Sequence, residues 1–308
     1  MNIPESSFIT ALLFGAVRSG TPFLLAGLGE LVAQKSGVLN LGLEGIMLAG
    51  ALSAVWVYSG SGSILLSMAV AAVFGGLLGI SHGYLCVRMR VNQVAAGLAM
   101  VIAGTGATAI LGRNLVGRRI DVDLPVGIAF FRSLPIVGRG LFGHDFMVYA
   151  SLLAAAGIWW FLACTRGGLR LRAAGESAES ARSCGINVAI TRLYASAFCG
   201  CMCGIGGGYL SLVYAGQWQE NMVSGRGWIA LVLVISSMWR PFVLVGAAYL
   251  FGGLTALQLN LQAIGVHISQ YFLGMVPFVI TIAALVVAAL IYRRRPNSMP
   301  VELTKGSD

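Results

Sequence analysis

The chain has 308 residues, of which 57% are apolar and only 10% are charged. A soluble domain carries roughly 25% charged residues, so this composition excludes a soluble globular protein and predicts a chain embedded in a lipid bilayer. The formal net charge of +9 is spread in short basic clusters between apolar runs and forms no basic face, which argues against a partner nucleic acid.

Eight apolar runs of spanning length follow one another along the chain, because roughly 20 residues cross the hydrocarbon core. All are expected to be helices, since an unpaired backbone cannot face lipid. A shorter run at about 225–238 is expected to cross as well. The sequence therefore predicts an all-α polytopic membrane protein, a single domain over residues 1–308, with about nine transmembrane segments (8–10). The eight long runs lie at about 8–32, 38–57, 63–87, 92–112, 146–165, 188–215, 242–262 and 270–292.

Arginines beside the predicted helix ends set the orientation, because cytoplasmic loops carry an excess of Lys and Arg. They follow the third run, the fifth run, the short run and the last run. Placing these four positions in the cytoplasm gives an external N-terminus and a cytoplasmic C-terminus. Aromatic residues near predicted helix ends are expected at the membrane interfaces. They are Trp56, Tyr58, Trp159, Trp160, Trp218, Trp239 and Tyr292.

The alternation of the runs predicts an internal inverted repeat with halves at about 8–112 and 188–292. The runs of the first half cross the membrane inward, outward, inward and outward. Those of the second half cross outward, inward, outward and inward, because the extra run at 146–165 lies between the two halves. A short echo accompanies this pattern, since Ser36-Gly37 and Ser224-Gly225 each open the second run of their half. Inverted repeats are common in transporters, where the solute route lies at the repeat interface.

The segment GELVAQKSGVLNLGLEGIMLAGA, residues 29–51, interrupts an apolar run with glycines, an amide and a carboxylate. Asn40 and Glu44 are four residues apart and are expected to share one helix face. A carboxylate at this depth is costly and usually faces a cavity or a partner. Two roles remain open: the pair lines or braces a translocation route, or it cross-links helices within the bundle.

A second glycine-interrupted segment, residues 220–241, contains the short run. Ser224, Gly225 and Gly227 surround Arg226, a pattern that predicts a half-helix or a re-entrant element. Arg226 either draws polar solutes to the outer mouth or is an interfacial arginine that reaches water.

The pair Asn92-Gln93 begins the fourth run. It either caps this helix or meets a solute at the inner mouth, and capping is the favoured role. The candidate residues of the solute pathway are Asn40, Glu44, Asn92, Gln93, Arg226 and Trp228.

The stretch RGGLRLRAAGESAESARSCGIN, residues 166–187, is the longest polar loop assigned to the cytoplasm. Ser177 is expected to cap a short helix over 178–184, because its hydroxyl can accept from a free backbone N–H. Charges of both signs surround this helix, which suits a docking element for another protein. The alternative is a solvated connector.

Signatures of catalysis and of metal or nucleotide binding are absent from the sequence, so the chain is not expected to be an enzyme. The glycine-rich stretch 204–209 lies inside an apolar run and predicts close helix packing. No GxxxxGK[ST] motif occurs, so no phosphate-binding loop for ATP is expected. The cysteines at 199, 201 and 203 alternate and have no histidine near them, so neither a metal nor another cofactor is predicted.

Three motifs, in this order, resemble permease subunits of ABC importers in the branched-chain amino acid, ribose and nucleoside group. They are KSGVLNLGLEGIML, LRAAGESAESARSCGIN and SGRGWIALVLVISSMWRP. The similarity covers about residues 15–292 and is strongest to the nucleoside or simple-sugar branch. Relatives often carry Asn-Pro after the glutamate of the second motif, where this chain has Ser177-Ala178.

The resemblance implies that two permease chains, identical or different, form the pathway in a bacterial inner (cytoplasmic) membrane. A separate ATPase would bind ATP on the cytoplasmic face, and a substrate-binding lipoprotein or periplasmic protein would deliver a nucleoside or simple sugar. An ion-coupled secondary transporter of a small polar solute is the alternative, and it would need intramembrane carboxylates such as Glu44. The resemblance also assigns the loop 166–187 to ATPase coupling, through Gly175, Glu176, Ser177, Arg182, Gly185 and Ile186.

Overall fold

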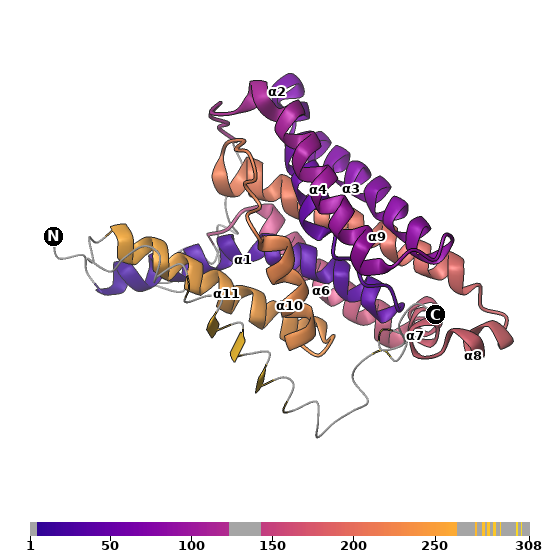
Figure 1. Ribbon diagram of the computed structural model, residues 1–308. Coiled ribbons are helices and arrows are strands. Elements are labelled where there is room, and N and C mark those ends of the chain that lie inside the picture. Colours follow the sequence, from indigo (N-terminus) through magenta and orange to yellow (C-terminus); the bar gives the residue numbers. More distant parts are fainter. Residues whose placement is uncertain are drawn as a thin grey trace.

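The computed structural model describes residues 5–122 and 143–263, together with scattered single positions between 275 and 303. These residues form helices and turns, with isolated β-bridges and no strand among them (Figure 1). The predicted all-α architecture is therefore confirmed.

The first part of the chain forms α1 (Glu5–Lys35), α2 (Leu43–Ser61), α3 (Ile64–Val87) and α4 (Gln93–Gly112), followed by the 3₁₀ turn η1 (Arg113–Leu115). The second part begins with α6 (Phe146–Cys164) and two short helices, α7 (Arg166–Glu176) and α8 (Ala178–Ser183). Then come α9 (Val188–Tyr209), which continues into the π-helical turn η3 (Leu210–Ala215), α10 (Arg226–Ser236) and α11 (Pro241–Ala263).

Seven helices among the described residues are long and apolar enough to cross a membrane. They are α1, α2, α3, α4 with η1, α6, α9 with η3, and α11. The helix α10 has 11 residues and is therefore about 16 Å long, roughly half of the 30 Å hydrocarbon core. This length fits the half-helix or re-entrant element predicted from the glycines around Arg226, and it is too short for the full crossing that was also expected of this run. The last predicted run, at about 270–292, lies outside the continuous described ranges, so the count of nine is not confirmed.

The helix α9 is central to the bundle and packs against α1, α2 and α3. Figure 1 shows α3 beside α9 and α1 beside α11, and these are extensive contacts. The first helix of each set of three therefore packs against the third helix of the other set. This reciprocal pairing is expected if α9–α11 repeat α1–α3 in inverted order. The repeat itself remains a prediction, because its fourth element in the second half lies outside the described ranges.

Glycines form the contact between α3 and α9. A Cβ atom added at Gly75 would lie 2.9 Å from the Cα of Gly204, and one added at Gly79 would lie 2.9 Å from the Cα of Gly200. Each helix thus presents two glycines four residues apart, which lets the backbones touch. Gly208 continues the seam against Met68 and Ala71, so the packing role predicted for residues 204–209 is confirmed.

Of the seven aromatic residues predicted at the interfaces, Tyr58 is half-buried and Tyr292 lies outside the described residues. Trp56, Trp159 and Trp160 are 70%, 45% and 60% exposed, as expected of side chains that face the surroundings of the bundle. Trp218 and Trp239, in contrast, are buried, so the interfacial prediction is wrong for both. Each packs inside the bundle, where an indole ring contributes a large buried apolar area.

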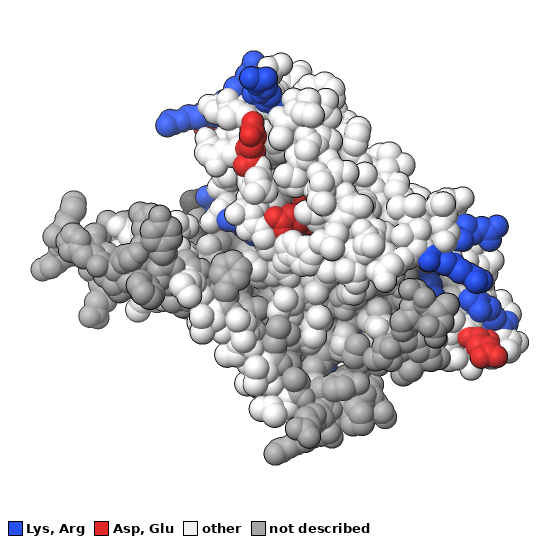
Figure 2. Space-filling model, viewed as in Figure 1, with Lys and Arg blue, Asp and Glu red and all other residues white. Residues whose placement is uncertain are grey.

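Contacts between distant segments define the two ends of the bundle. At one end, Trp239 donates to Gln34, and Leu39 donates to Gln93. This end also carries α7 and α8, and we name it the cytoplasmic end after its predicted orientation. At the opposite, outer end, Ile120 donates to the carbonyl of Gly216 at 2.8 Å. Figure 2 shows basic side chains gathered beside acidic ones at the α7–α8 end.

Candidate functional site

The segment between α1 and α2 is not helical, although the apolar run predicted a helix from about residue 38. Gly37 has a φ of +88°, a conformation that glycine adopts without strain, and α2 begins only at Leu43. Asn40 lies in this turn, where its Oδ1 accepts from the N–H of Gly42 at 2.9 Å. The prediction that Asn40 and Glu44 share one helix face is therefore wrong.

A buried carboxylate in α1, Glu30, holds the turn 36–42 in place. Its Oε1 accepts from the backbone N–H of Asn40 at 3.0 Å and from the side-chain amide of Gln34 at 2.9 Å. The thiol of Cys199 donates to Oε2 at 3.4 Å. Gln34 in turn accepts from the Trp239 indole at 2.6 Å. The network joins α1, the turn, α9 and the segment after α10.

Glu44 connects the start of α2 to the start of the half-helix α10. Its Oε1 accepts from the N–H of Gly225 at 2.6 Å, which places the carboxylate at the positive end of the α10 dipole. Its Oε2 is buried and has no hydrogen-bond partner among the described residues. A Cβ at Gly227 would lie 2.6 Å from the Glu44 nitrogen, so the two helix starts touch through their backbones. Glu44 is thus a cross-link between helices, and a role in the pathway stays a proposal.

Arg226, the first residue of α10, is held beside Glu44 and Tyr214. Its Nη1 donates to the carbonyls of Met222 at 2.9 Å and Val223 at 3.2 Å, and its guanidinium lies 6.0 Å from the centroid of the Tyr214 ring. These contacts fold the side chain back onto the turn that precedes α10. Trp228, two residues further into α10, is half-buried.

A polar cavity of about 480 Å³ lies at the outer end. Arg18 projects into it from the first apolar run and donates to the carbonyl of Val213 in η3. The Nε of Arg18 is buried without a partner among the described residues. Tyr214 lines the same cavity and also contacts Arg226, so this residue lies between the cavity and the start of α10. π-Helical turns such as η3 often occur at functional sites.

Arg18 and Glu30 were not predicted to be functional residues, although both interrupt the first apolar run. Ionisable residues inside membrane helices are rare and usually have a partner or a function. That signal was therefore present in the sequence, and only the positions of their partners required the structure.

At the cytoplasmic end, Asn92 and Gln93 brace the backbone. Asn92 caps α4, because its Oδ1 accepts from the N–H groups of Val94 at 2.9 Å and Ala95 at 3.2 Å. The favoured capping role is confirmed. Gln93 accepts from the N–H of Leu39 at 2.7 Å and so supports the turn 36–42 from the side of α4.

The loop 166–187 folds into α7 and α8. Ser177 caps α8 by accepting from the N–H of Ser180 at 3.2 Å, so the predicted cap is confirmed. Gly185 ends α8 with a φ of +78°, and the N–H of Ile186 returns to the carbonyl of Ala181 at 3.0 Å. Ile186 packs against a small apolar cluster that includes Ala181. The side chains left exposed on this element include those of Glu176 and Arg182.

The α7 helix is fixed directly to the turn that follows α1. A Cβ added at Gly175 would lie 3.0 Å from the carbonyl carbon of Lys35 and 3.3 Å from the nitrogen of Gly37. Arg192 of α9 donates to the carbonyls of Ser36 at 3.0 Å and Ala174 at 3.1 Å. The backbone of α7 and the side chain of Arg192 are thus in direct contact with the start of the turn 36–42.

Within the described ranges, no group of three or more His, Cys, Asp or Glu side chains is placed to hold a metal ion. The described residues combine a polar cavity with a half-helix in a bundle of helices of spanning length, features that occur together in membrane transport proteins. The chain belongs to the family described as branched-chain amino acid transport system / permease component, which matches residues 12–291. It is thus a multi-pass permease subunit of an ABC transporter.

Curated relatives agree with this family. The putative glucose ABC transporter permease protein TsgC13 of Haloferax volcanii is 38% identical over 84% of this chain and 80% of its own length. The guanosine ABC transporter permease protein NupQ of Bacillus subtilis is 30% identical over 86% of this chain and 87% of its own. The nucleoside ABC transporter permease protein NupC of Lactococcus lactis is 28% identical over 86% of this chain and 88% of its own length. No solved structure matches the chain significantly. These relatives confirm the resemblance and do not favour the ion-coupled alternative.

We expect Glu44→Gln to lower solute uptake severalfold while the protein still folds. Glutamine keeps an acceptor for the Gly225 N–H but removes the negative charge that faces the α10 dipole, and such contacts contribute about 0.3–2 kcal/mol. Uptake by the complete transporter and the thermal midpoint of the purified protein are the measurements. Glu220→Gln, which neutralises an exposed carboxylate, is the control and should be neutral. Uptake at the wild-type rate in Glu44→Gln would show that transport does not use the charge.

Proposed function

We propose that this chain is one of two permease subunits of an ATP-driven importer for nucleosides or simple sugars in a bacterial inner membrane. A separate ATPase subunit binds and hydrolyses ATP on the cytoplasmic face, and a substrate-binding lipoprotein or periplasmic protein delivers the solute. The chain itself holds no cofactor and catalyses no covalent step. The solutes named for its relatives, which are guanosine, nucleosides and glucose, support this cargo class.

The observation that carries the proposal is the contact between α7 and the turn 36–42. In this mechanism the ATPase docks on the exposed face of α8 and moves α7 with it. Gly175 and Arg192 pass that movement to the turn, because both contact its backbone directly. Asn40 and Glu44 then connect the turn to the α10 half-helix, so ATP hydrolysis changes the geometry around the centre of the bundle.

In this proposal the solute route runs from the outer polar cavity toward the junction of α2 and α10. Arg18 and Tyr214 supply hydrogen-bonding groups in the cavity, and Arg226 and Glu44 follow at the junction. Nucleosides and sugars carry several hydroxyl groups, which such side chains can bind in exchange for water. Asn92 and Gln93 support the route from the cytoplasmic end without touching the solute.

Transport by the reconstituted complex tests the proposal. The chain is purified with its ATPase and second permease, placed in proteoliposomes with ATP on the ATPase side, and given the binding protein with radiolabelled guanosine, ribose or glucose. We expect uptake of at least one of these solutes that stops when the ATPase is inactivated. Uptake that needs no ATP and disappears when an ionophore collapses the ion gradients would contradict the proposal.

We expect Gly185→Val to abolish uptake and to uncouple the ATPase without preventing membrane insertion. Valine at a φ of +78° costs roughly 1–2 kcal/mol, which is enough to disturb the end of α8 but not the bundle. Glu176→Lys, which reverses an exposed charge between α7 and α8, should have the same effect. Uptake and ATP hydrolysis are measured on the same proteoliposomes.

A matched control for the glycine is available at the outer end. Gly117 also has a φ of +78° and open space around it, so Gly117→Val introduces the same backbone strain far from α8. It should leave the ratio of solute imported to ATP hydrolysed unchanged. Normal transport in both Gly185→Val and Glu176→Lys would remove α8 from the coupling mechanism.

A further inference from the structure

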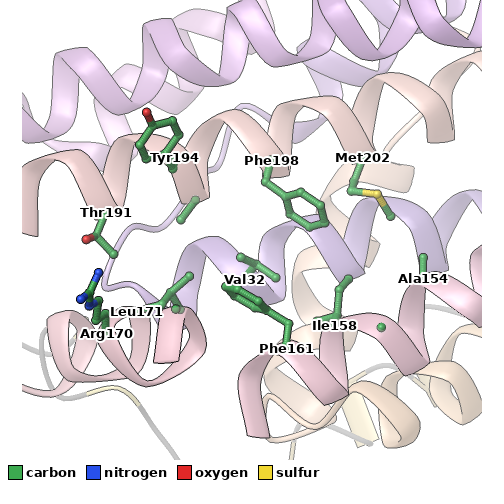
Figure 3. Close-up of a pocket in the computed structure, with 13 residues that line it drawn as sticks. Val32, Ala154, Ile158, Phe161, Arg170, Leu171, Thr191, Tyr194, Phe198 and Met202 are labelled. Atoms are coloured by element: carbon green, nitrogen blue, oxygen red, sulfur yellow. The ribbon is translucent and has the colours of Figure 1, made fainter. Parts of the chain in front are cut away.

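A long apolar groove runs along the bundle between α6, α7 and α9, and the proposed solute route does not use it. Its volume is about 600 Å³. Figure 3 shows Phe161 and Ile158 of α6 facing Phe198 and Met202 of α9, with Val32 of α1 behind them. The lining of the groove over this length is therefore almost entirely hydrocarbon.

The groove opens toward the surroundings of the bundle. Phe198 on its rim is 38% exposed and Tyr194 is 73% exposed. Both belong to α9, which together with α6 is long and apolar enough to span a membrane, so the opening faces lipid. The α6 wall also leaves space, because a Cβ added at Gly157 would meet no atom within 4 Å.

One end of the groove is polar. Figure 3 places Arg170 of α7 next to Thr191 of α9, with Tyr194 one turn further along α9. This end lies where α6 gives way to α7, at the cytoplasmic end of the bundle. No described residue forms a hydrogen bond or ion pair with Arg170. The groove therefore combines a guanidinium that no described residue pairs, and two hydroxyl groups, at its mouth with an apolar channel behind them.

We propose that this groove binds one phospholipid of the cytoplasmic leaflet, with its phosphate at Arg170 and an acyl chain along the apolar lining. The charges match, because Arg170 is cationic and the phosphate is anionic, while Thr191 and Tyr194 can donate to its remaining oxygens. Basic pockets between transmembrane helices on the cytoplasmic side are typical headgroup sites. An apolar helix of a partner subunit would fill the channel but would leave Arg170 without a counter-charge.

The bound lipid would touch the coupling element, because α7 provides Arg170 on one side and Gly175 on the other. Gly175 contacts the turn after Lys35, and Leu171 between them lines the groove. The phospholipid thus wedges between α7 and the two spanning helices, and it fixes the position of α7 against the bundle.

Lipid retention by the intact purified transporter tests the site. The complex is stripped of lipid in detergent and titrated with phosphatidylglycerol, and native mass spectrometry counts the bound molecules. We expect one tightly bound lipid in the wild type. Arg170→Gln should weaken its binding about fivefold, since one arginine near the membrane surface contributes about that factor. Arg172→Gln, on the same helix but outside the groove, is the control and should bind as the wild type does.

A second variant blocks the apolar part without disturbing the fold. Gly157→Leu places its side chain in the open space of the groove and should abolish the tightly bound lipid. Gly106→Leu on α4, where a Cβ also meets nothing within 4 Å, should retain it. Wild-type lipid retention in both Arg170→Gln and Gly157→Leu would overturn the proposal. Loss of a partner subunit from the Gly157→Leu complex, with the lipid retained, would also overturn it and assign the groove to a protein contact.

Discussion

Replacing Gly200 with leucine should prevent stable folding, because the backbone of α3 already occupies the space that the new side chain needs. A Cβ at this position would lie 2.9 Å from the carbonyl carbon of Gly75 and 2.9 Å from the Cα of Gly79. These neighbours are backbone atoms, so no side chain can rotate away. Overpacking a close contact typically costs about 1–3 kcal/mol, and here a whole helix must move. We therefore expect a loss of about 3 kcal/mol or more.

Yield of monodisperse protein and its thermal midpoint in detergent measure this effect. Gly246→Leu is the matched control, because this glycine lies in the apolar helix α11 and a Cβ there meets no atom within 4 Å. It should fold as well as the wild type. A thermal midpoint unchanged by Gly200→Leu would show that α3 and α9 are further apart than the structure places them.

The elements of this fold were largely predictable, because their signals are local in the sequence. The run predicted at 63–87 became α3 at Ile64–Val87, and the run at 146–165 became α6 at Phe146–Cys164. Length and hydropathy belong to consecutive residues, so they can be read without knowledge of the fold. The caps at Asn92 and Ser177 were predictable for the same reason, since each bonds only two or three residues away.

The centre of the bundle was not predictable, because its partners are distant in the sequence. Residues 38–42 continue an apolar run that is typical of a spanning helix. The carboxylate of Glu30, however, accepts a hydrogen bond from the backbone N–H of Asn40, which keeps this segment in a turn. Glu44 bonds Gly225, which lies 181 positions away. Trp239 looked interfacial because it follows an apolar run, yet its partner Gln34 lies 205 positions away. Hydropathy reports how apolar a segment is and contains no information on such pairs.

Glu30→Leu should destabilise the protein and abolish transport, because this carboxylate is the acceptor for three donors in the core. Leucine would leave the N–H of Asn40 and the amide of Gln34 without their acceptor, and Cys199 would lose its partner. Each buried donor left unsatisfied costs about 1–3 kcal/mol. The expected loss is therefore about 3 kcal/mol or more, and the turn 36–42 loses its attachment to α1.

Two further substitutions separate the hydrogen bonds from the volume of the side chain. Glu30→Gln keeps an acceptor oxygen for Asn40 in a side chain of the same shape, so it should restore most of the thermal midpoint and part of the uptake. Cys199→Ala removes the weak thiol donor to Glu30 and the weak sulfur acceptor for the Asn40 amide, and it should change stability by about 1 kcal/mol or less. If Glu30→Leu were as stable as the wild type, another group would have to satisfy the Asn40 N–H. Glu30 would then not be needed to hold the turn 36–42, and the contacts of Gly175 and Arg192 would have to position the turn without it.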